Sequence, residues 1–416
     1  MGATEEIIRI SRSPIREGWM FQRIEELRGR IVSQFASSPH KGKDVFEDRQ
    51  EAMRFGVGVV NATLPIILKH GDVECADPAH GPGHWIRDLA HVLQIANDEI
   101  VPVEWIVPVV VAGTLHDIGT MFVDRFVEKN HVVRHAELGA LIVHDAVQEC
   151  LKFGKRDADL LVYAIAAHTH YLQPMTSVCR DGTERTSQPY PDMHDGKPFL
   201  PVWAVRWADR LDLVGPCMVG RQFFTLLRDH EDFGADGYFT KSFVPSMRTI
   251  VRDGGEIKQA GGKRTLLEFL SMLARSQTSD SPYGKHDAGV MVALRDANKE
   301  SLEHVIWSVL HPQDVDVERI LKAWTLFLGM NVGPTRAGRM AAHDLGLRFR
   351  NLDPDVRRAW ACGFRTAMCE YLPWADRTLA FLNRMPAECL RLGSLVPDIR
   401  DAIRPNPAWV SVLIDS

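Results

Sequence analysis

A histidine and an aspartate stand next to each other at positions 116 and 117, at the end of an uncharged apolar run that covers residues 109–115. The residues Ile118-Gly119 follow this pair directly. An imidazole nitrogen and a carboxylate oxygen are both common ligands of transition metal ions. A pair of these residue types that emerges from a buried element indicates a metal site in the interior of the protein.

Four further histidines and aspartates are candidates for the rest of the metal shell, and they are spread widely along the chain: His84, His135, His168 and Asp209. Helical bundles assemble metal sites in this way, from side chains that facing helices project inward. Histidine and carboxylate ligands without cysteine suit Fe, Mn, Co, Ni or Zn. Six protein ligands are too many for one ion that keeps an open position. We therefore expect two divalent or transition metal ions (Fe, Mn or similar), with Asp117 bridging them.

Two of these candidates also have a simpler interpretation. His84 follows the helix breakers at residues 81–83 and fits a surface histidine at a helix start. Asp209 lies among apolar residues, and burying it unpaired costs several kcal/mol, so either a metal ion or the adjacent Arg210 must neutralise it.

Two positions have rivals nearby in the sequence. His131 and His144 compete with His135, and His170 competes with His168. Residues 168 and 170 would point apart on a helix, so only one of them is expected to be a ligand.

Other His-Asp pairs occur in the chain, and two of them serve as controls, His144-Asp145 and His286-Asp287. Neither pair both follows an uncharged apolar run and precedes a segment with a small residue, such as Ile118-Gly119. We interpret both pairs as structural.

The composition argues against several broad classes of function. The chain has 416 residues, 45% of them apolar, and a formal net charge of −5, which gives no support to general nucleic-acid or membrane-surface binding. Seven dispersed cysteines without a CxxC spacing indicate reduced thiols in a cytoplasmic setting. No signal peptide is visible, and the apolar run at residues 105–115 is eleven residues long, whereas a membrane span needs about 20. We expect a cytoplasmic protein.

Helical periodicity dominates the chain, and the sequence predicts an all-α fold. Residues 105–115 fit a buried strand or a buried helix; we favour the helix, because Pro102 and Pro108 would disrupt a central strand and Pro108 fits a first helical turn. Residues 172–198 lose the periodicity and are expected to form a long loop, either a lid or a surface insertion. The other helices are expected at residues 17–36, 46–69, 84–97, 135–153, 157–169, 202–214, 264–275, 289–310, 315–329, 334–346, 353–371 and 373–383.

The region from residue 80 to residue 214 resembles the HD-domain superfamily, in the branch that binds two metal ions through an H-HD-H-H-D pattern. The matching stretches are His84-Trp85-Ile86-Arg87, Leu115-His116-Asp117-Ile118-Gly119, His135-Ala136-Glu137-Leu138-Gly139, Ile165-Ala166-Ala167-His168-Thr169 and Trp207-Ala208-Asp209-Arg210.

The resemblance implies an HD-domain helical bundle at residues 76–220, preceded by a helical segment at residues 1–75 and followed by a helical extension at residues 221–416. It implies that one ion is held by His84, His116, Asp117 and Asp209, and the second ion by Asp117, His135 and His168.

The same branch includes dinucleoside polyphosphate hydrolases and HD-GYP cyclic-dinucleotide phosphodiesterases. The resemblance therefore implies a metal-dependent phosphohydrolase that cleaves a phosphoester or phosphoanhydride in a small, nucleotide-like substrate, with His116 and Asp117 in the catalytic centre. The residues expected to bind substrate are Arg87, Lys129, Arg134 and His170, although the three cations also fit a solvated surface.

The chain departs from this pattern in ways that keep other activities open. Thr120 stands where such hydrolases often carry a lysine, and no GYP segment follows. The two-metal pattern is also used by diiron oxygenases related to myo-inositol oxygenase and to a phosphonate-cleaving enzyme, which break a C–C or C–P bond. A third alternative is a degenerate HD module that acts as a helical sensor.

Overall fold

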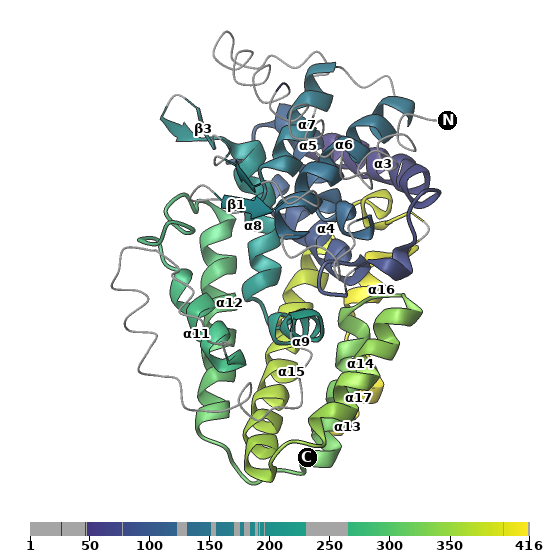
Figure 1. Ribbon diagram of the computed structural model, residues 1–416. Helices are drawn as coiled ribbons and strands as arrows, with labels where there is room; N and C mark the ends of the chain where they lie inside the picture. The colour runs from purple at the N-terminus through teal and green to yellow at the C-terminus, as the bar shows by residue number, and fades with distance from the viewer. Residues whose placement is uncertain are drawn as a thin grey trace.

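Helices make up most of the described chain, which confirms the all-α fold class (Figure 1). The structure, a computed structural model, describes residues 26, 46, 48–76, 78–122, 131–150, 155–169, 175–178, 184–187, 190, 192–194, 196–229, 265–393 and 395–414. Figure 1 places the earlier helices, coloured purple to blue, above the C-terminal helices, coloured green to yellow.

Helix α5 (Val103–Leu115) lies at the centre of the earlier helices. Every side chain from Ile106 to Leu115 is buried, as expected for a helix that is apolar on all sides. The helix packs against four neighbours: α3 (Arg49–Leu68), α4 (Pro82–Asn97), α7 (Lys155–Ala166) and α8 (Leu200–Val214). The preference for a helix over a strand here is therefore confirmed.

The expected position of Pro108 within this helix was wrong. The helix begins at Val103, so Pro108 lies in its interior and not in its first turn. Proline has no N–H to bond the carbonyl of Glu104, four residues earlier. Glu104 is exposed, and solvent can take the place of the missing donor.

A second layer surrounds this centre. Helix α6 (His131–Cys150) packs against α3 and α7, and also against the short 3-10 helix η3 (Ile118–Met121) that follows α5. Helix α9 (Met218–Asp229) follows α8 and contacts two C-terminal helices, α13 (Val317–Asn331) and α14 (Arg336–Phe349).

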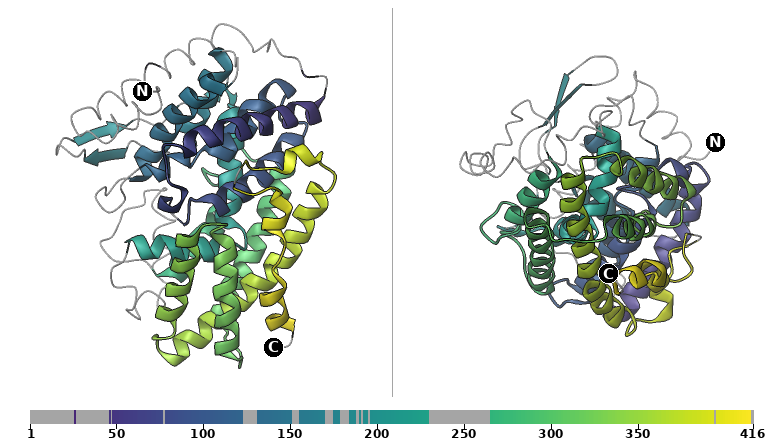
Figure 2. Two further views of the ribbon diagram at one scale, coloured as in Figure 1. Left: turned by 90° about the vertical axis from the view of Figure 1, so that its right-hand side faces the viewer. Right: turned by 90° about the horizontal axis from the view of Figure 1, so that it is seen from below.

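The C-terminal helices form the other part of the molecule (Figure 2). They pair mainly with one another: α12 with α15, and α13 with α14, α15 and α17. The bounds of the helices not yet given are α11 Leu266–Ser276, α12 Val290–Leu310, α15 Pro354–Leu382, α16 Ile399–Ile403 and α17 Pro407–Ile414, with short 3-10 helices η2 Val73–Cys75 and η5 Ala387–Leu390.

Helix α15 corrects the expectation of two helices at residues 353–371 and 373–383. It runs unbroken from Pro354 to Leu382, with Pro373 inside it. Proline removes one helical hydrogen bond, but Tyr371 and Trp374 are buried on either side of it. Tertiary packing of these large side chains holds the helix together through the proline.

The segment expected to be a loop at residues 172–198 contains two short antiparallel ladders. Strand β1 (Met175–Val178) pairs with β2 (Glu184–Ser187), and β3 (Met193–His194) pairs with β4 (Lys197–Pro198). The loop expectation was wrong for these residues. Strands this short have no apolar alternation long enough to be detected in the sequence.

Three expectations are not settled by the fold. The helix at residues 17–36 lies outside the described residues except for Glu26, which is helical. The three-part division at residues 75 and 220 stays a prediction. The cytoplasmic location also stays a prediction. Within the described part of the chain, one helix, α3, is long and apolar enough to cross a membrane, and half of its apolar stretch is buried in the fold.

Gly119 allows two elements that carry candidate ligands to touch. A Cβ atom at this position would lie 2.0 Å from the carbonyl oxygen of His135 and 2.7 Å from the backbone nitrogen of Gly139. The backbones of η3 and α6 are therefore in direct contact. In contrast, a Cβ atom on Gly58, which is exposed on α3, would meet nothing within 4 Å.

We predict opposite effects for alanine at these two glycines. Gly119→Ala should lower the free energy of unfolding by about 1–3 kcal/mol or more, because backbone must move to accept the methyl group. Gly58→Ala should raise it by about 0.5–1 kcal/mol through helix propensity. Thermal or urea denaturation measures both, and a Gly119→Ala variant as stable as the wild type would contradict the contact.

Candidate metal centre

The structure brings all six predicted ligands into one cluster. They come from separate elements: His84 from α4, His116 and Asp117 from the junction of α5 and η3, His135 from α6, His168 from the end of α7, and Asp209 from α8. Apart from Asp209, whose side chain is 14% exposed, each of these side chains is at least 95% buried. Their role as metal ligands stays a prediction, but their convergence is a property of the fold.

Asp117 lies between two groups of side chains. Its Oδ2 atom is 3.2 Å from Nε2 of His84 and 3.6 Å from Nε2 of His116. Its Oδ1 atom is 3.1 Å from Nε2 of His135 and 3.5 Å from Nε2 of His168. One carboxylate therefore faces a histidine pair with each of its two oxygens.

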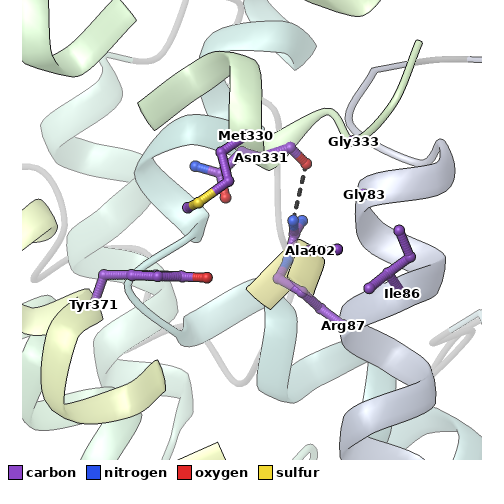
Figure 3. A pocket seen from close by; sticks show the side chains of 8 residues that line it. All are labelled: Gly83, Ile86, Arg87, Met330, Asn331, Gly333, Tyr371 and Ala402. Carbon is purple, nitrogen blue, oxygen red and sulfur yellow. Dashed lines mark hydrogen bonds between the residues drawn. The ribbon is translucent and has the colours of Figure 1, made fainter. Parts of the chain in front are cut away.

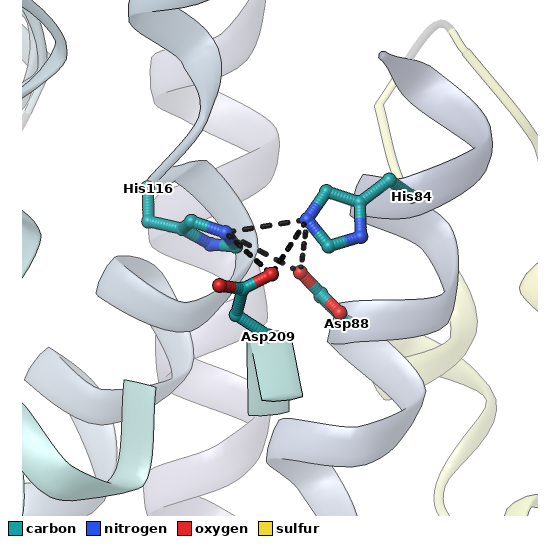
Figure 4. Close-up of side chains that lie close together, drawn as sticks. All are labelled: His84, Asp88, His116 and Asp209. Carbon is teal, nitrogen blue, oxygen red and sulfur yellow. Dashed lines mark hydrogen bonds and ion pairs between the residues drawn. The ribbon is translucent and has the colours of Figure 1, made fainter. Parts of the chain in front are cut away.

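The sequence analysis missed a further carboxylate, Asp88. It follows His84 by four residues on α4, so both side chains lie on one face of the helix. Oδ2 of Asp88 is 2.9 Å from Nε2 of His84 and 3.5 Å from Nε2 of His116 (Figure 4). The i,i+4 spacing was the signal in the sequence that could have identified it.

Two half-sites can now be defined, with Asp117 common to both. The first half-site consists of His84, Asp88, His116, Asp117 and Asp209; the second half-site consists of Asp117, His135 and His168. Ligand atoms lie within 4.8 Å of one another in two groups of these residues. One group is His84, Asp88, His116 and Asp209, and the other is His116, Asp117 and His168.

The outer nitrogens of three histidines have fixed partners. Nδ1 of His84 lies 2.8 Å from Oδ2 of Asp212, Nδ1 of His116 lies 2.9 Å from the carbonyl oxygen of Gly113, and Nδ1 of His168 lies 2.6 Å from that of Ile165. Each of these acceptors requires a proton on Nδ1. The neutral ring then presents the lone pair of Nε2 to the cluster, as metal-ligating histidines do.

The electrostatics of the first half-site favour a cation. Burial and neighbouring carboxylates raise the pKa of Asp88 to about 7. The pKa of His84 is raised well above its usual range, because surrounding carboxylates outweigh its burial and the charge of Arg221. Burial lowers the pKa of His116 to about 3, so this ring is neutral. Protons supply positive charge in the ion-free protein, and a metal ion that binds here displaces them.

Arg221 is a second residue that the sequence analysis missed. This α9 side chain is buried, and its Nη1 atom lies 3.5 Å from Oδ1 of Asp209 and 3.3 Å from Oδ2 of Asp212. Although burial opposes it, Arg221 lowers the pKa of Asp209 to about 2. Arg210, the partner considered for Asp209 from the sequence, instead pairs with Asp287.

Arg87, which was predicted to bind substrate, is bonded to protein groups in the structure. Its Nε and Nη2 atoms donate to the two carboxylate oxygens of Asp212, at 2.5 and 3.0 Å, and Nη1 donates to the carbonyl oxygen of Asn331 at 2.9 Å (Figure 3). The adjoining cavity is about 10 Å³, which is room for about one water molecule. Arg87 therefore orients Asp212, and its substrate-binding role stays a prediction.

The structure does not show the contacts of the other three residues that were predicted to bind substrate. Lys129 and His170 lie outside the described residues, and Arg134 lies in α6 with a side chain that the structure does not describe. Of the rivals considered from the sequence, His144 hydrogen-bonds Asp145 at 3.1 Å and Gln148 at 2.9 Å, in a separate buried pair. Asp287 pairs with Arg210 and Arg295.

No protein-family model matches this chain, and no curated protein or solved structure matches it. The geometry is compatible with an HD-type site, and the family assignment stays a prediction that rests on the residues.

Asp212 offers a test of the hydrogen bond that orients His84. Asp212→Asn should weaken metal binding by roughly 10- to 100-fold, because the ring loses a charged acceptor for its Nδ1–H. Isothermal titration with Mn²⁺ measures the change. Asp145→Asn is the matched control, since it removes a buried carboxylate bonded to a histidine outside the cluster. Unchanged affinity in Asp212→Asn would contradict this role.

Proposed function

We propose that this protein is a metal-dependent phosphohydrolase that cleaves a phosphoester or phosphoanhydride bond in a small phosphorylated, nucleotide-like substrate at a dinuclear centre. The observation that carries the proposal is the position of Asp117. Its two oxygens lie 3.2 Å from His84 and 3.1 Å from His135, in two different half-sites. A carboxylate in this arrangement is suited to bridge two ions.

The donor set fits two metal ions. Both carboxylate oxygens of Asp88 and Oδ2 of Asp117 are buried without a hydrogen-bond donor. Imidazole and carboxylate ligands together suit Fe, Mn or similar ions. Two such ions, when bound, lower the pKa of a coordinated water, polarise the phosphoryl oxygens and stabilise the leaving oxygen.

The protein's own contribution is orientation and the exclusion of water. His116 is held in one orientation by the carbonyl of Gly113, and Asp117 is completely enclosed. Asp209 is the most exposed member of the cluster, at 14%, so the substrate is expected to approach on its side. His80, which is partly exposed, has its ring centre 6.3 Å from that of His84 and 6.1 Å from that of His135, where it would meet an incoming phosphoryl group.

One observation favours a second candidate, a diiron oxygenase that cleaves a C–C or C–P bond. Thr120 occupies the position of the lysine that often touches phosphate in such hydrolases, and its hydroxyl donates to the carbonyl of Asp117 at 2.8 Å. Arg87 and Arg221 also use donors on Asp212. The oxygenase would require iron and would consume O₂, whereas the hydrolase would act anaerobically.

The test of the hydrolase is a panel of phosphoesters and phosphoanhydrides incubated anaerobically with the Mn²⁺-loaded protein. We expect release of phosphate or of a nucleotide, and loss of both metal binding and turnover in Asp117→Ala, because both half-sites lose a ligand. Asp145→Ala should retain both properties. O₂ consumption by iron-loaded protein without anaerobic hydrolysis would favour the oxygenase, and a chain that binds no metal would favour the sensor module.

A second expected outcome concerns stability. An ion that binds only the folded state stabilises it by about 2.7 kcal/mol at a concentration 100 times its Kd. Mn²⁺ should therefore raise the melting temperature of chelator-treated wild-type protein and should not raise that of Asp117→Ala. Differential scanning calorimetry measures the shift, and equal shifts for the two proteins would place the bound ion elsewhere.

A further inference from the structure

Asp88 is a buried carboxylate that faces two imidazole nitrogens of the cluster, Nε2 of His84 and Nε2 of His116. The side chain has no exposed surface, and neither carboxylate oxygen has a hydrogen-bond donor. Figure 4 shows it directed, with His84, His116 and Asp209, at a common point. Oδ2 lies 2.9 Å from Nε2 of His84 and 3.5 Å from Nε2 of His116.

Nearby arginines do not account for this carboxylate, which contacts imidazole nitrogens among the described residues. Arg87, one residue earlier on α4, donates to Asp212 and to the carbonyl of Asn331. Arg221 donates to Asp209 and Asp212. A charged group that is buried without a partner is strongly destabilising, so structures keep such groups where an ion or a counter-charge meets them.

The two half-sites differ in charge as a result. The first half-site contains two imidazoles and three carboxylates, those of Asp88, Asp117 and Asp209. The guanidinium of Arg221, which lies 3.5 Å from Asp209 and 3.4 Å from His84, offsets one of these negative charges. Among the described residues, the second half-site contains two imidazoles and Asp117 alone. The attraction between an ion and its ligands grows with each added negative charge, and it is strong where water is excluded.

We propose that Asp88 is a further ligand of the ion in the first half-site, and that it makes this half-site bind its ion more tightly than the second. This inference rests on the dinuclear centre of the proposed function and deepens it. The first half-site fills first and holds its ion permanently. The second half-site, which has fewer protein ligands, keeps positions open for water and substrate and exchanges its ion more readily.

The experiment is a titration of the chelator-treated full-length protein with Mn²⁺. Calorimetry and the electron paramagnetic resonance signal of free Mn²⁺ monitor the binding. Wild-type protein should bind two ions in two steps, the first at least about tenfold tighter than the second. His135→Gln should lose the weaker step and keep the tighter one. This variant then provides a background in which the first half-site is measured alone.

Asp88→Asn in the His135→Gln background isolates the proposed ligand. The substitution keeps the size of the side chain and removes its charge, so the Kd of the remaining step should rise at least about tenfold. Loss of a residue that only supports a metal ligand already weakens metal binding by about this factor. Asp145→Asn in the same background, which removes a buried carboxylate of the separate His144 pair, should leave the Kd unchanged.

Three results would overturn the inference. Wild-type protein whose two steps have equal Kd values would contradict unequal half-sites, without any variant having to fold. Asp88→Asn with a Kd within twofold of its background would exclude Asp88 as a ligand; in both cases the dinuclear function itself would stand. Wild-type protein that binds no Mn²⁺ would instead remove the proposed function together with this inference.

Discussion

The concentration of buried negative charge beside α4 is the constraint on which the rest of the structure depends. Four aspartates of this region, Asp88, Asp117, Asp209 and Asp212, are almost fully enclosed. Buried carboxylates are tolerated only when opposite charges meet them. Arg87 and Arg221 meet Asp212, and Arg221 also meets Asp209. Asp88 and Asp117 have no such partner, and their oxygens face the Nε2 atoms of histidines. Among the described residues, arginines neutralise the outer carboxylates, whereas histidines meet the inner ones, in an arrangement that could hold a cation.

The C-terminal helices take part in this arrangement. The turn after α13 is joined to the start of α4: the backbone nitrogen of Gly83 donates to the carbonyl of Val332 at 3.2 Å, and Arg87 donates to that of Asn331 (Figure 3). A Cβ atom on Gly83 would lie 2.0 Å from the Asn331 carbonyl oxygen, so the two backbones touch. A chain of contacts thus runs from Asn331 through Arg87 and Asp212 to His84. Residues more than 200 positions beyond the histidine help to set its orientation.

The sequence was informative about the inner cluster and uninformative about what supports it. The six candidate ligands could be identified because histidine and aspartate at the ends of apolar helices are costly unless they have a purpose. Asp88 was available from its i,i+4 relation to His84 but was not considered. The pairing of Arg87 with Asp212 joins residues 125 positions apart, and the sequence does not reveal it. Arg221 is near Asp209 and Asp212 in the sequence, but it lies on a different helix, and no spacing rule relates the two helices. The same limit applies to the elements: the periodicity predicted most helices, whereas continuation through Pro373 depends on tertiary packing.

Hydrolase and oxygenase chemistry share one requirement of this centre, an open position beside an ion that the protein holds firmly. The unequal supply of carboxylates meets this requirement. The first half-site has five side chains, of which Asp209 is partly exposed, and the second has Asp117, His135 and His168 among the described residues. His80 is partly exposed, and its ring lies near those of both His84 and His135, so the route by which a substrate would arrive borders both half-sites. In the proposed hydrolase, two ions held by these residues would supply the positive charge at the phosphoryl group that Arg87, bonded to Asp212, does not.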